Sequence, residues 1–240
     1  MNLKDKLTIV IPCKNEENYI GRTLKSIISQ ENIEGIHIII ADGNSTDRTR
    51  NIIRYYQSRF AHKVNIEIID GGSVSEGRNK GSELVTTKYV LFMDSDVILM
   101  NKNVINKTIY EMYHYRLDLL TCKTTSYGND IRTWLSFMLF NIINLISSIK
   151  RPFAVGTYFL TKRDKFRMLG GFDETILHSE DYVLSGKYDV KKFRISNHHI
   201  GQDDRRFKKM GYFGMVKLII KGFLNRNNPE FFKKDINYWN

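Results

Sequence analysis

Two acidic residues separated by one serine interrupt an otherwise apolar segment, LFMDSDVILM (residues 91–100). In an extended chain, alternate side chains point to the same side, so Asp94 and Asp96 can face one cation together. Carboxylate oxygens suit hard divalent ions such as Mg²⁺ and Mn²⁺, and such sites take further oxygens from water and substrate phosphates. The segment therefore predicts a metal-assisted site for a ligand that carries phosphate.

The elements that must position these acids can be predicted from the apolar pattern of the first half. Four runs rich in β-branched residues predict buried strands, at 7–12, 36–42, 64–70 and 88–94. Helical patterns separate them, at 16–30, 45–60 and 74–85. Ser45 or Thr46 is the expected N-cap of the second helix, and two glycines weaken the third. This alternation predicts a parallel sheet covered by helices.

Acidic residues recur where the predicted strands end. Asp42, Asp70, Asp94 and Asp96 all stand at such ends, and ligands of parallel sheets bind beyond the carboxyl ends of the strands. A single acid there could be a turn residue, an alternative equally open for Asp70. Four of them favour a shared site. Because neither GxGxxG nor GxxxxGK[ST] occurs, a nucleotide would have to be held by carboxylates and a metal.

The composition limits the class of partner and the compartment. The 240 residues suffice for one large domain or two small ones. A formal net charge of +11 favours anionic partners: nucleic acid, phosphorylated small molecules or an acidic membrane surface. Cys13 and Cys122 form no motif, so a reducing compartment is the simplest interpretation. The apolar core of the N-terminal segment is too short for a signal peptide, which favours a cytoplasmic location.

Two segments of the second half could contact a membrane. Residues 134–149 carry no charge but fall short of the roughly 20 residues that a membrane-spanning helix needs. A buried core helix and a helix lying in the membrane interface remain open, with a true span the least favoured. Residues 212–228 mix apolar side chains with Lys217 and Lys221. This predicts a basic amphipathic helix that binds an anionic membrane surface or packs on its own domain.

A series of short motifs makes the chain resemble the family 2 glycosyltransferases, which have the nucleotide-sugar-binding fold called GT-A. The motifs lie, in the order found in that family, at 8–27, 38–49, 78–81, 89–97, 156–174, 178–187 and 202–211. The resemblance implies an α/β GT-A domain over 1–211, with a Rossmann-like, mostly parallel central sheet and helices on both faces. Residues 1–100 would form its nucleotide-sugar-binding half and 101–211 its acceptor-binding and catalytic half. Residues 212–240 would form a basic, amphipathic C-terminal tail on the acceptor side.

The resemblance also implies roles in holding the nucleotide. Pro12, Asn15 and Glu17 match the first-strand motif, whose members hold the base and ribose. Asp42 matches the acid that hydrogen-bonds the base. For Arg78, a contact to the nucleotide and a structural salt bridge are equally open.

The DSD motif and its surroundings match the metal-binding part of the family. Asp94 matches the acid near the ribose, and Asp96 matches the direct ligand of Mn²⁺ or Mg²⁺, with Ser95 between them. His199 could be a third metal ligand, although a packing or surface role is the more common one for such a histidine. The expected donor is a UDP- or GDP-linked sugar.

The remaining matches concern catalysis. Asp181, in the pair Glu180-Asp181, matches the catalytic base of inverting members, and Glu180 is expected at the donor sugar. Arg205 and Arg206 suit phosphates because a guanidinium can engage two oxygens. The Q-x-x-R-W signature of processive relatives lacks its tryptophan here, since the segment reads Gln202-Asp203-Asp204-Arg205-Arg206-Phe207. Polymer synthesis is therefore not expected.

The resemblance and the charge together predict the acceptor and the location. A lipid-linked glycan or a membrane lipid is the expected acceptor, with the protein held peripherally on the cytoplasmic face of a membrane. A polyprenyl-phosphate sugar transferase is the nearest alternative, and a nucleotidyltransferase is a further one. A basic nucleic-acid-binding protein would explain the charge, but acids gathered at strand ends would repel phosphates, so no nucleic-acid partner is expected.

Overall fold

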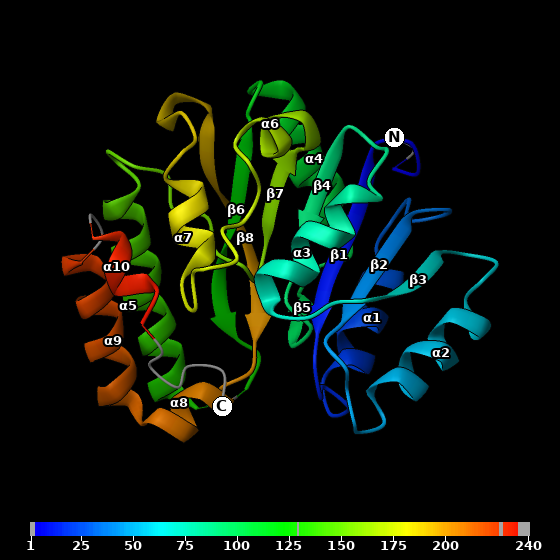
Figure 1. Ribbon diagram of the computed structural model, residues 1–240, viewed down its shortest axis with the longest axis horizontal. Coiled ribbons are helices and arrows are strands. Elements are labelled where there is room, and N and C mark those ends of the chain that lie inside the picture. The colour runs from blue at the N-terminus through cyan, green and yellow to red at the C-terminus, as the bar shows by residue number, and fades with distance from the viewer. Residues whose placement is uncertain (1–2, 129, 226–227, 235–240) are drawn as a thin grey trace.

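The computed structural model describes residues 3–128, 130–225 and 228–234. Within these ranges one eight-stranded sheet has the order β3-β2-β1-β4-β7-β6-β8-β5, and helices cover both of its faces (Figure 1). The strands are β1 (Leu7–Cys13), β2 (His37–Asp42), β3 (Asn65–Asp70), β4 (Tyr89–Phe92), β5 (Val97–Leu99), β6 (Leu119–Ser126), β7 (Phe159–Lys162) and β8 (Phe193–Gln202). The helices are α1 (Ile20–Ile28), α2 (Thr49–Arg59), α3 (Val74–Glu83), α4 (Val104–His114), α5 (Ile131–Ser147), α6 (Arg163–Met168), α7 (Glu180–Ser185), α8 (Arg205–Met210), α9 (Tyr212–Leu224) and α10 (Pro229–Phe232), with a short 3₁₀ turn at Val190–Lys192.

The four predicted strands form the parallel half of the sheet. β3, β2, β1 and β4 lie side by side and run in the same direction, so their carboxyl ends share one edge. Cys13 is the register partner of Asp42, which in turn is the partner of Asp70. Antiparallel β7 then joins β4 to the second half of the chain. The predicted α/β architecture is confirmed, and it brings acids from separate strands to one edge.

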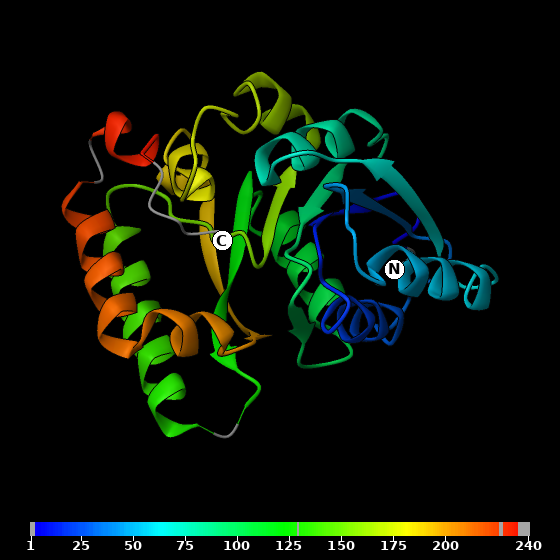
Figure 2. The same ribbon diagram turned by 60° about the horizontal axis from the view of Figure 1, so that its bottom comes forward.

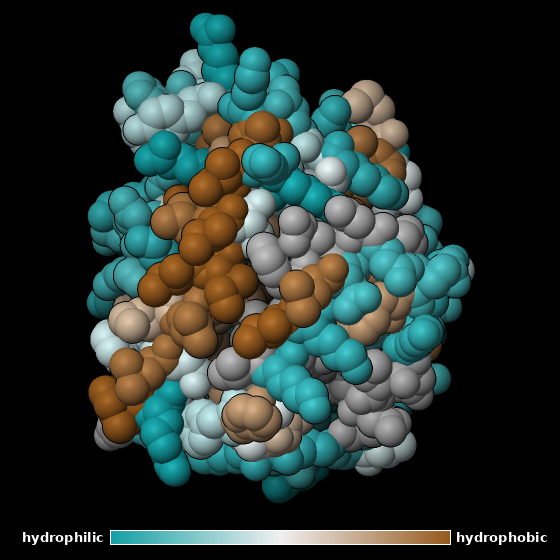
Figure 3. All heavy atoms as spheres, turned by 90° about the vertical axis from the view of Figure 1, so that its left-hand side faces the viewer, coloured by the Kyte–Doolittle hydropathy of each residue, from teal (hydrophilic) through white to brown (hydrophobic). Residues whose placement is uncertain are grey.

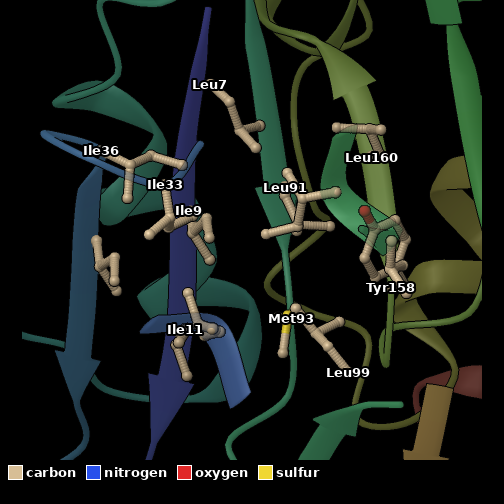
Figure 4. Packing of buried hydrophobic residues seen from close by; sticks show 14 of the residues in the cluster. Leu7, Ile9, Ile11, Ile33, Ile36, Leu91, Met93, Leu99, Tyr158 and Leu160 are labelled. Atoms are coloured by element: carbon tan, nitrogen blue, oxygen red, sulfur yellow. The ribbon is translucent and has the colours of Figure 1, made fainter. Parts of the chain in front are cut away.

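Alternate side chains of β1 belong to two hydrophobic cores, one on each face of the sheet. Ile9 and Ile11 pack in the core that includes α1 and α4, and Figure 4 shows them on the same side as Leu91. Val10 belongs to the opposite core, with Phe166 of α6. A strand covered on both faces has no need of polar residues, which explains the continuous apolar run at 7–12.

The two glycines of α3 allow the helix to approach the sheet closely. A Cβ at Gly77 would lie 3.2 Å from the Cβ of Ala41, and one at Gly81 would overlap the Cγ1 of Val10. A capping box between Ser73 and Glu76 starts the helix. The glycines lower helix propensity, as expected from the sequence, but close packing on β1 and β2 requires them.

The first residues after β2 form a loop and not the start of a helix. α2 begins at Thr49 with Arg48 as its N-cap residue, so the expectation that Ser45 or Thr46 caps this helix is wrong. Ser45 instead donates its backbone N–H and its hydroxyl to the side chain of Asp42. The Ser45 hydroxyl donates to Asp42 and accepts from the backbone N–H of Asn15, so it holds this loop together and does not cap α2.

The uncharged segment at 134–149 is not a buried core helix. It forms most of α5, where only Thr133, Phe137 and Asn144 are buried, while nine apolar side chains from Ile131 to Ile149 are 40–70% exposed. None of the helices in the described ranges combines the length and the apolar character needed to cross a bilayer. The interfacial interpretation of this segment stays a prediction.

The predicted C-terminal tail starts with α9, which packs beside α5 (Figure 2). Its last described part returns to the main domain, because Phe232 of α10 packs with Ile176 and Tyr182. The backbone N–H of Leu177 also donates to the carbonyl of Phe232. Residues 226–227 and 235–240 of this tail lie outside the described residues.

The fit of α3 on β1 can be tested with a matched pair of helix glycines. Gly81→Ala forces the new methyl group into Val10, and we expect it to lower the free energy of unfolding by about 1–3 kcal/mol. Gly222→Ala in α9 meets open space, so the better helix propensity of alanine should raise stability by up to about 1 kcal/mol. Urea unfolding of both variants measures the difference. An equal effect of the two substitutions would contradict the close packing of α3.

Candidate active site

Residues of the β1 loop tie two strand ends together. Asn15 has the left-handed φ of 54°; its Oδ1 accepts from the backbone N–H of Thr46 at 2.8 Å, and its own N–H donates to Ser45 Oγ at 2.9 Å. Glu17 accepts from the backbone N–H of Arg48 at 3.0 Å. The preceding Pro12 is buried within β1. These three residues, expected at the base and ribose, thus shape the edge where a nucleotide would lie.

Asp42 is the most deeply buried of the strand-end acids, with a fully buried side chain. It accepts from the hydroxyl of Ser45 at 2.5 Å and from Arg50 Nε at 2.5 Å. Arg50 also donates to Asp70 Oδ1 at 2.9 Å, and Asp70 is 88% exposed. Arg50 therefore neutralises the acids of two neighbouring strands. In this state the Asp42 carboxylate faces its own loop, and its expected contact to a base stays a prediction.

A second arginine links the DSD motif to the predicted catalytic pair. Arg78 of α3 is 1% exposed; it donates to Asp94 Oδ1 at 2.7 Å and to Glu180 Oε1 at 2.5 Å. Its guanidinium lies 5.1 Å from the centre of the Phe172 ring. Burial opposes its charge, but the carboxylates of Glu180, Asp94 and Asp181 raise the pKa of Arg78 overall. Of the two interpretations of this residue, the structure provides the salt bridge.

A third arginine neutralises the second acid of the DSD motif. Arg205, at the start of α8, donates to both oxygens of Glu16 at 2.9 and 2.6 Å and to Asp96 Oδ2 at 2.9 Å. Its guanidinium stacks 4.4 Å from the ring centre of Tyr19, and Asp96 is 3% exposed. Between the two acids, buried Ser95 accepts at its carbonyl from the hydroxyl of Thr23 at 2.7 Å. The C-terminal helix α8 is thereby held against the β1 and β4 loops.

Asp181 lies at the start of α7, and backbone N–H groups bind both of its carboxylate oxygens. Its oxygens accept from the backbone N–H groups of Gly156 at 2.6 Å and Tyr182 at 2.7 Å. Burial, reinforced by repulsion from Glu180, raises the pKa of Asp181 to about 7, against the lowering effect of Arg78 and the two N–H groups. A Cβ at Gly156 would collide with the Arg78 guanidinium. Glycine is therefore needed where Arg78 and Asp181 meet.

The metal prediction names Asp94 and Asp96, with His199 as a possible third ligand. Within the described ranges, no three or more His, Cys, Asp and Glu side chains are arranged around one metal position. His199 is exposed on β8 and has Lys123 as its register partner. Burial, Lys123 and His198 lower the pKa of His199. Asp94 and Asp96 have the oxygen chemistry that suits Mg²⁺ or Mn²⁺, provided that donor phosphates and water complete the coordination.

Sequence patterns did not reveal some partners of these acids. No role was assigned to Glu16 or Arg50 from the sequence. Glu16 lies between the matched residues Asn15 and Glu17, and Arg50 directly follows the matched segment 38–49. Gly156 lies within the matched segment 156–174, but its role depends on two side chains from distant parts of the chain. The side chain of Arg206 lies outside the described part of the structure.

The fold and this site define a GT-A-type α/β domain with an acidic strand-end site. The family model described as "Glycosyl transferase family 2" matches residues 8–170. This is more than half of the chain, so the chain belongs to glycosyl transferase family 2. The predicted family and fold are thus confirmed.

Curated relatives that match this chain include two glycosyltransferases. Glycosyltransferase GlyA of Streptococcus pneumoniae is 31% identical over 120 residues, which cover 50% of this chain and 17% of that protein. The 4,4'-diaponeurosporenoate glycosyltransferase of Staphylococcus aureus is 26% identical over 201 residues, covering 79% of this chain and 53% of that one. The chain thus spans 17% and 53% of these two relatives.

Two solved structures share the fold at low sequence identity. Mannosyltransferase PcManGT from Pyrobaculum calidifontis, in complex with GDP-Man and Mn²⁺, superposes with a TM-score of 0.66 and 15% identity. That likeness covers 90% of this chain and 64% of PcManGT. S. aureus TarS 1-349 in complex with UDP-GlcNAc has a TM-score of 0.57 and 19% identity, covering 83% of this chain and 56% of that structure.

The Arg78 bridge predicts a large loss of stability when the cation is removed. Arg78→Met leaves the buried carboxylate of Glu180 and the partly buried one of Asp94 without their shared partner, and breaking a buried ion pair typically costs about 3–5 kcal/mol of unfolding free energy. Arg48→Met is the matched control, because Arg48 is 80% exposed in its pair with Glu17 and should contribute less than about 1 kcal/mol. Denaturant unfolding compares the two, and similar small losses would refute the bridging role.

The raised pKa of Asp181 predicts a pH-dependent stability difference. A carboxyl whose folded pKa lies near 7, above its ordinary value, favours folding when protonated and loses that contribution as pH rises through 7. The stability of Asp181→Asn relative to wild type should therefore increase from pH 5 to pH 8. Asp173→Asn is the control, because the Thr175 hydroxyl and backbone N–H lower the pKa of Asp173 and move its titration below this window. A pH-independent difference for Asp181→Asn would contradict the assignment.

Proposed function

We propose that this chain is an inverting glycosyltransferase that moves a sugar from a UDP- or GDP-linked donor to an acceptor hydroxyl. The observation that carries the proposal is the ion-pair chain from Asp94 through Arg78 to Glu180. It links Asp94 of the DSD motif to Glu180, the chain neighbour of Asp181, whose pKa of about 7 suits a general base. Donor-side and acceptor-side groups then belong to one site.

The reaction is a single in-line displacement. The acceptor oxygen bonds to the anomeric carbon while the bond from that carbon to the diphosphate oxygen breaks, and the diphosphate leaves with the electron pair. Asp181 takes the proton from the acceptor hydroxyl. Arg205 lies at Asp96 and can turn its guanidinium towards phosphate oxygens, where its charge opposes the charge that develops on the leaving group.

A divalent cation fits the same edge of the site. Asp96 would be its direct ligand and Asp94 would lie on the ribose side, with Mn²⁺ or Mg²⁺ as the candidates. When bound, such an ion supplies Lewis-acid neutralisation of the leaving diphosphate. The Mn²⁺ in the PcManGT complex supports a divalent metal without fixing which one this chain uses.

The proposed acceptor is a lipid-linked glycan or a membrane lipid, with the protein peripheral on the cytoplasmic face of a membrane. The net charge of +11 and the exposed apolar side chains of α5 support this acceptor class. A polyprenyl phosphate is the alternative acceptor. Its oxygen is already ionised at neutral pH, so its transfer would need little help from Asp181.

Release of nucleoside diphosphate from a panel of UDP- and GDP-sugars, with Mn²⁺ or Mg²⁺ and lipid acceptors, tests the proposal. Asp96→Asn should reduce turnover by roughly 100-fold or more, and Asp181→Asn by about 10²–10⁴-fold with a hydroxyl acceptor. Asp164→Asn is the control, because Asp164 is 83% exposed on α6. Turnover of Asp181→Asn near wild type would point to the phosphate acceptor. Wild-type turnover by folded Asp96→Asn would refute the site.

A further inference from the structure

The polarity of α5 is the reverse of that of an ordinary surface helix. Its polar stripe faces the protein: Asn141 donates to the carbonyl of Thr124 at 2.7 Å and accepts from the Thr124 N–H at 3.0 Å. Asn144 is 2% exposed, and the hydroxyl of Thr133 is bonded to that of Tyr212 at 3.0 Å. Because the helix uses its polar groups to bind the domain, its apolar groups are left on the outside.

These apolar groups form one exposed face together with α9. The members from α5 and the turn that follows it are Ile131, Trp134, Leu135, Met138, Leu139, Ile142, Leu145, Ile146 and Ile149. They are joined by Phe213, Ile220 and Leu224 of α9, which are 83%, 47% and 72% exposed. Figure 3 shows apolar atoms in a band across this side of the molecule. At about 1.5 Å per residue, the 17-residue α5 is roughly 26 Å long, and an exposed apolar face of this size marks an interaction surface.

The charges around this α5–α9 face determine which partner fits it. Residues 205–225 contain six Lys and Arg and no Asp or Glu. Lys217 and Lys221 are exposed on α9, and Arg132 and Lys150 are exposed near the two ends of α5. A second copy of the chain docked about a two-fold axis would place the same cations against each other. Anionic lipid headgroups satisfy the cations while the acyl region receives the apolar side chains.

We propose that the α5–α9 face docks on an anionic lipid bilayer, with α5 lying flat and its apolar side chains inserted below the headgroups. Lys217 and Lys221 then bind the lipid phosphates. The docking surface itself does not depend on the proposed function. Only its benefit does, because docking would bring the site close to a lipid-borne acceptor.

Side-chain packing connects the α5–α9 face to the candidate site. Phe207 of α8 packs on Phe137 of α5 with ring centres 5.0 Å apart, and the same short helix begins with Arg205, which holds Asp96 and Glu16. A bilayer under α5 and α9 therefore lies beside the helix that closes one side of the site. A lipid-borne acceptor would reach the site from this direction.

Vesicle co-sedimentation of the full chain tests the docking surface. Wild type should bind vesicles of 70% phosphatidylcholine and 30% phosphatidylglycerol at least tenfold more tightly than pure phosphatidylcholine vesicles. Ile142→Glu/Ile146→Glu should lose at least tenfold in binding to the anionic vesicles. Lys217→Glu/Lys221→Glu should weaken binding to the anionic vesicles by at least about fivefold for each lysine replaced. It should also remove most of the preference for anionic over neutral vesicles. Tyr110→Glu/Tyr113→Glu on α4 is the matched control, because these residues are 58% and 71% exposed and lie outside the face.

Circular dichroism and light scattering of each variant separate the outcomes. The variants alter exposed positions, so native helicity and melting temperature are expected to be kept. Equal binding of wild type and Ile142→Glu/Ile146→Glu would overturn the proposal. So would a wild-type dimer that this double variant converts to monomer without a change in vesicle binding. Nucleoside diphosphate release from the panel of UDP- and GDP-sugars, with Mn²⁺ or Mg²⁺ and lipid acceptors, is measured in parallel. Intact vesicle binding without any release would refute the proposed function and not the docking surface.

Discussion

Charge neutralisation by three arginines is the interaction on which the site depends. A parallel sheet brings the carboxyl ends of its strands to one edge, and in this chain those ends carry acids. Carboxylates brought together away from water repel each other and resist ionisation. Arg50, Arg78 and Arg205 each bridge two of them. The planar guanidinium can bind two carboxylates at once, which a lysine ammonium does with less geometric control.

The same bridges give neighbouring carboxylates different properties. Arg78 holds Asp94 and Glu180 directly and acts on Asp181 only through its charge, so burial dominates and raises the pKa of Asp181. One carboxylate of the group is thereby poised to exchange a proton, whereas its neighbours are engaged by a cation. The surroundings of each carboxylate, and not its residue type, determine its pKa, as expected where acids share one site. Arg50 and Arg205 are 34% and 33% exposed, whereas Arg78 is 1% exposed, so two of the three bridges are accessible to solvent.

Packing explains two features that local propensity would misjudge. The glycines of α3 lower its helix propensity, yet the helix forms because its glycines let it lie directly on β1 and β2. In α5, the uncharged sequence is typical of a core helix, yet hydrogen bonds from Asn141 turn the polar stripe inward. Hydrophobic periodicity identifies the polar and apolar stripes of α5 but not which of them faces the protein. The hydrogen bonds of Asn141 to the backbone of Thr124 on β6 place the polar stripe on the inner side.

The sequence by itself determined the alternation of strands and helices in the first half, the acids at the strand ends and the glycosyltransferase family. These depend on side-chain periodicity and on short motifs, which are local. Only the tertiary structure decided which cation holds which acid, because Arg78 and Glu180 are 102 positions apart and Glu16 and Arg205 are 189 apart. Local rules also placed the start of α2 too early, because the backbone N–H and hydroxyl of Ser45 donate to the strand-end carboxylate of Asp42 and hold residues 45–46 in a loop. Pairing, burial and the pKa of Asp181 depend on distant segments packed together, which no local pattern specifies.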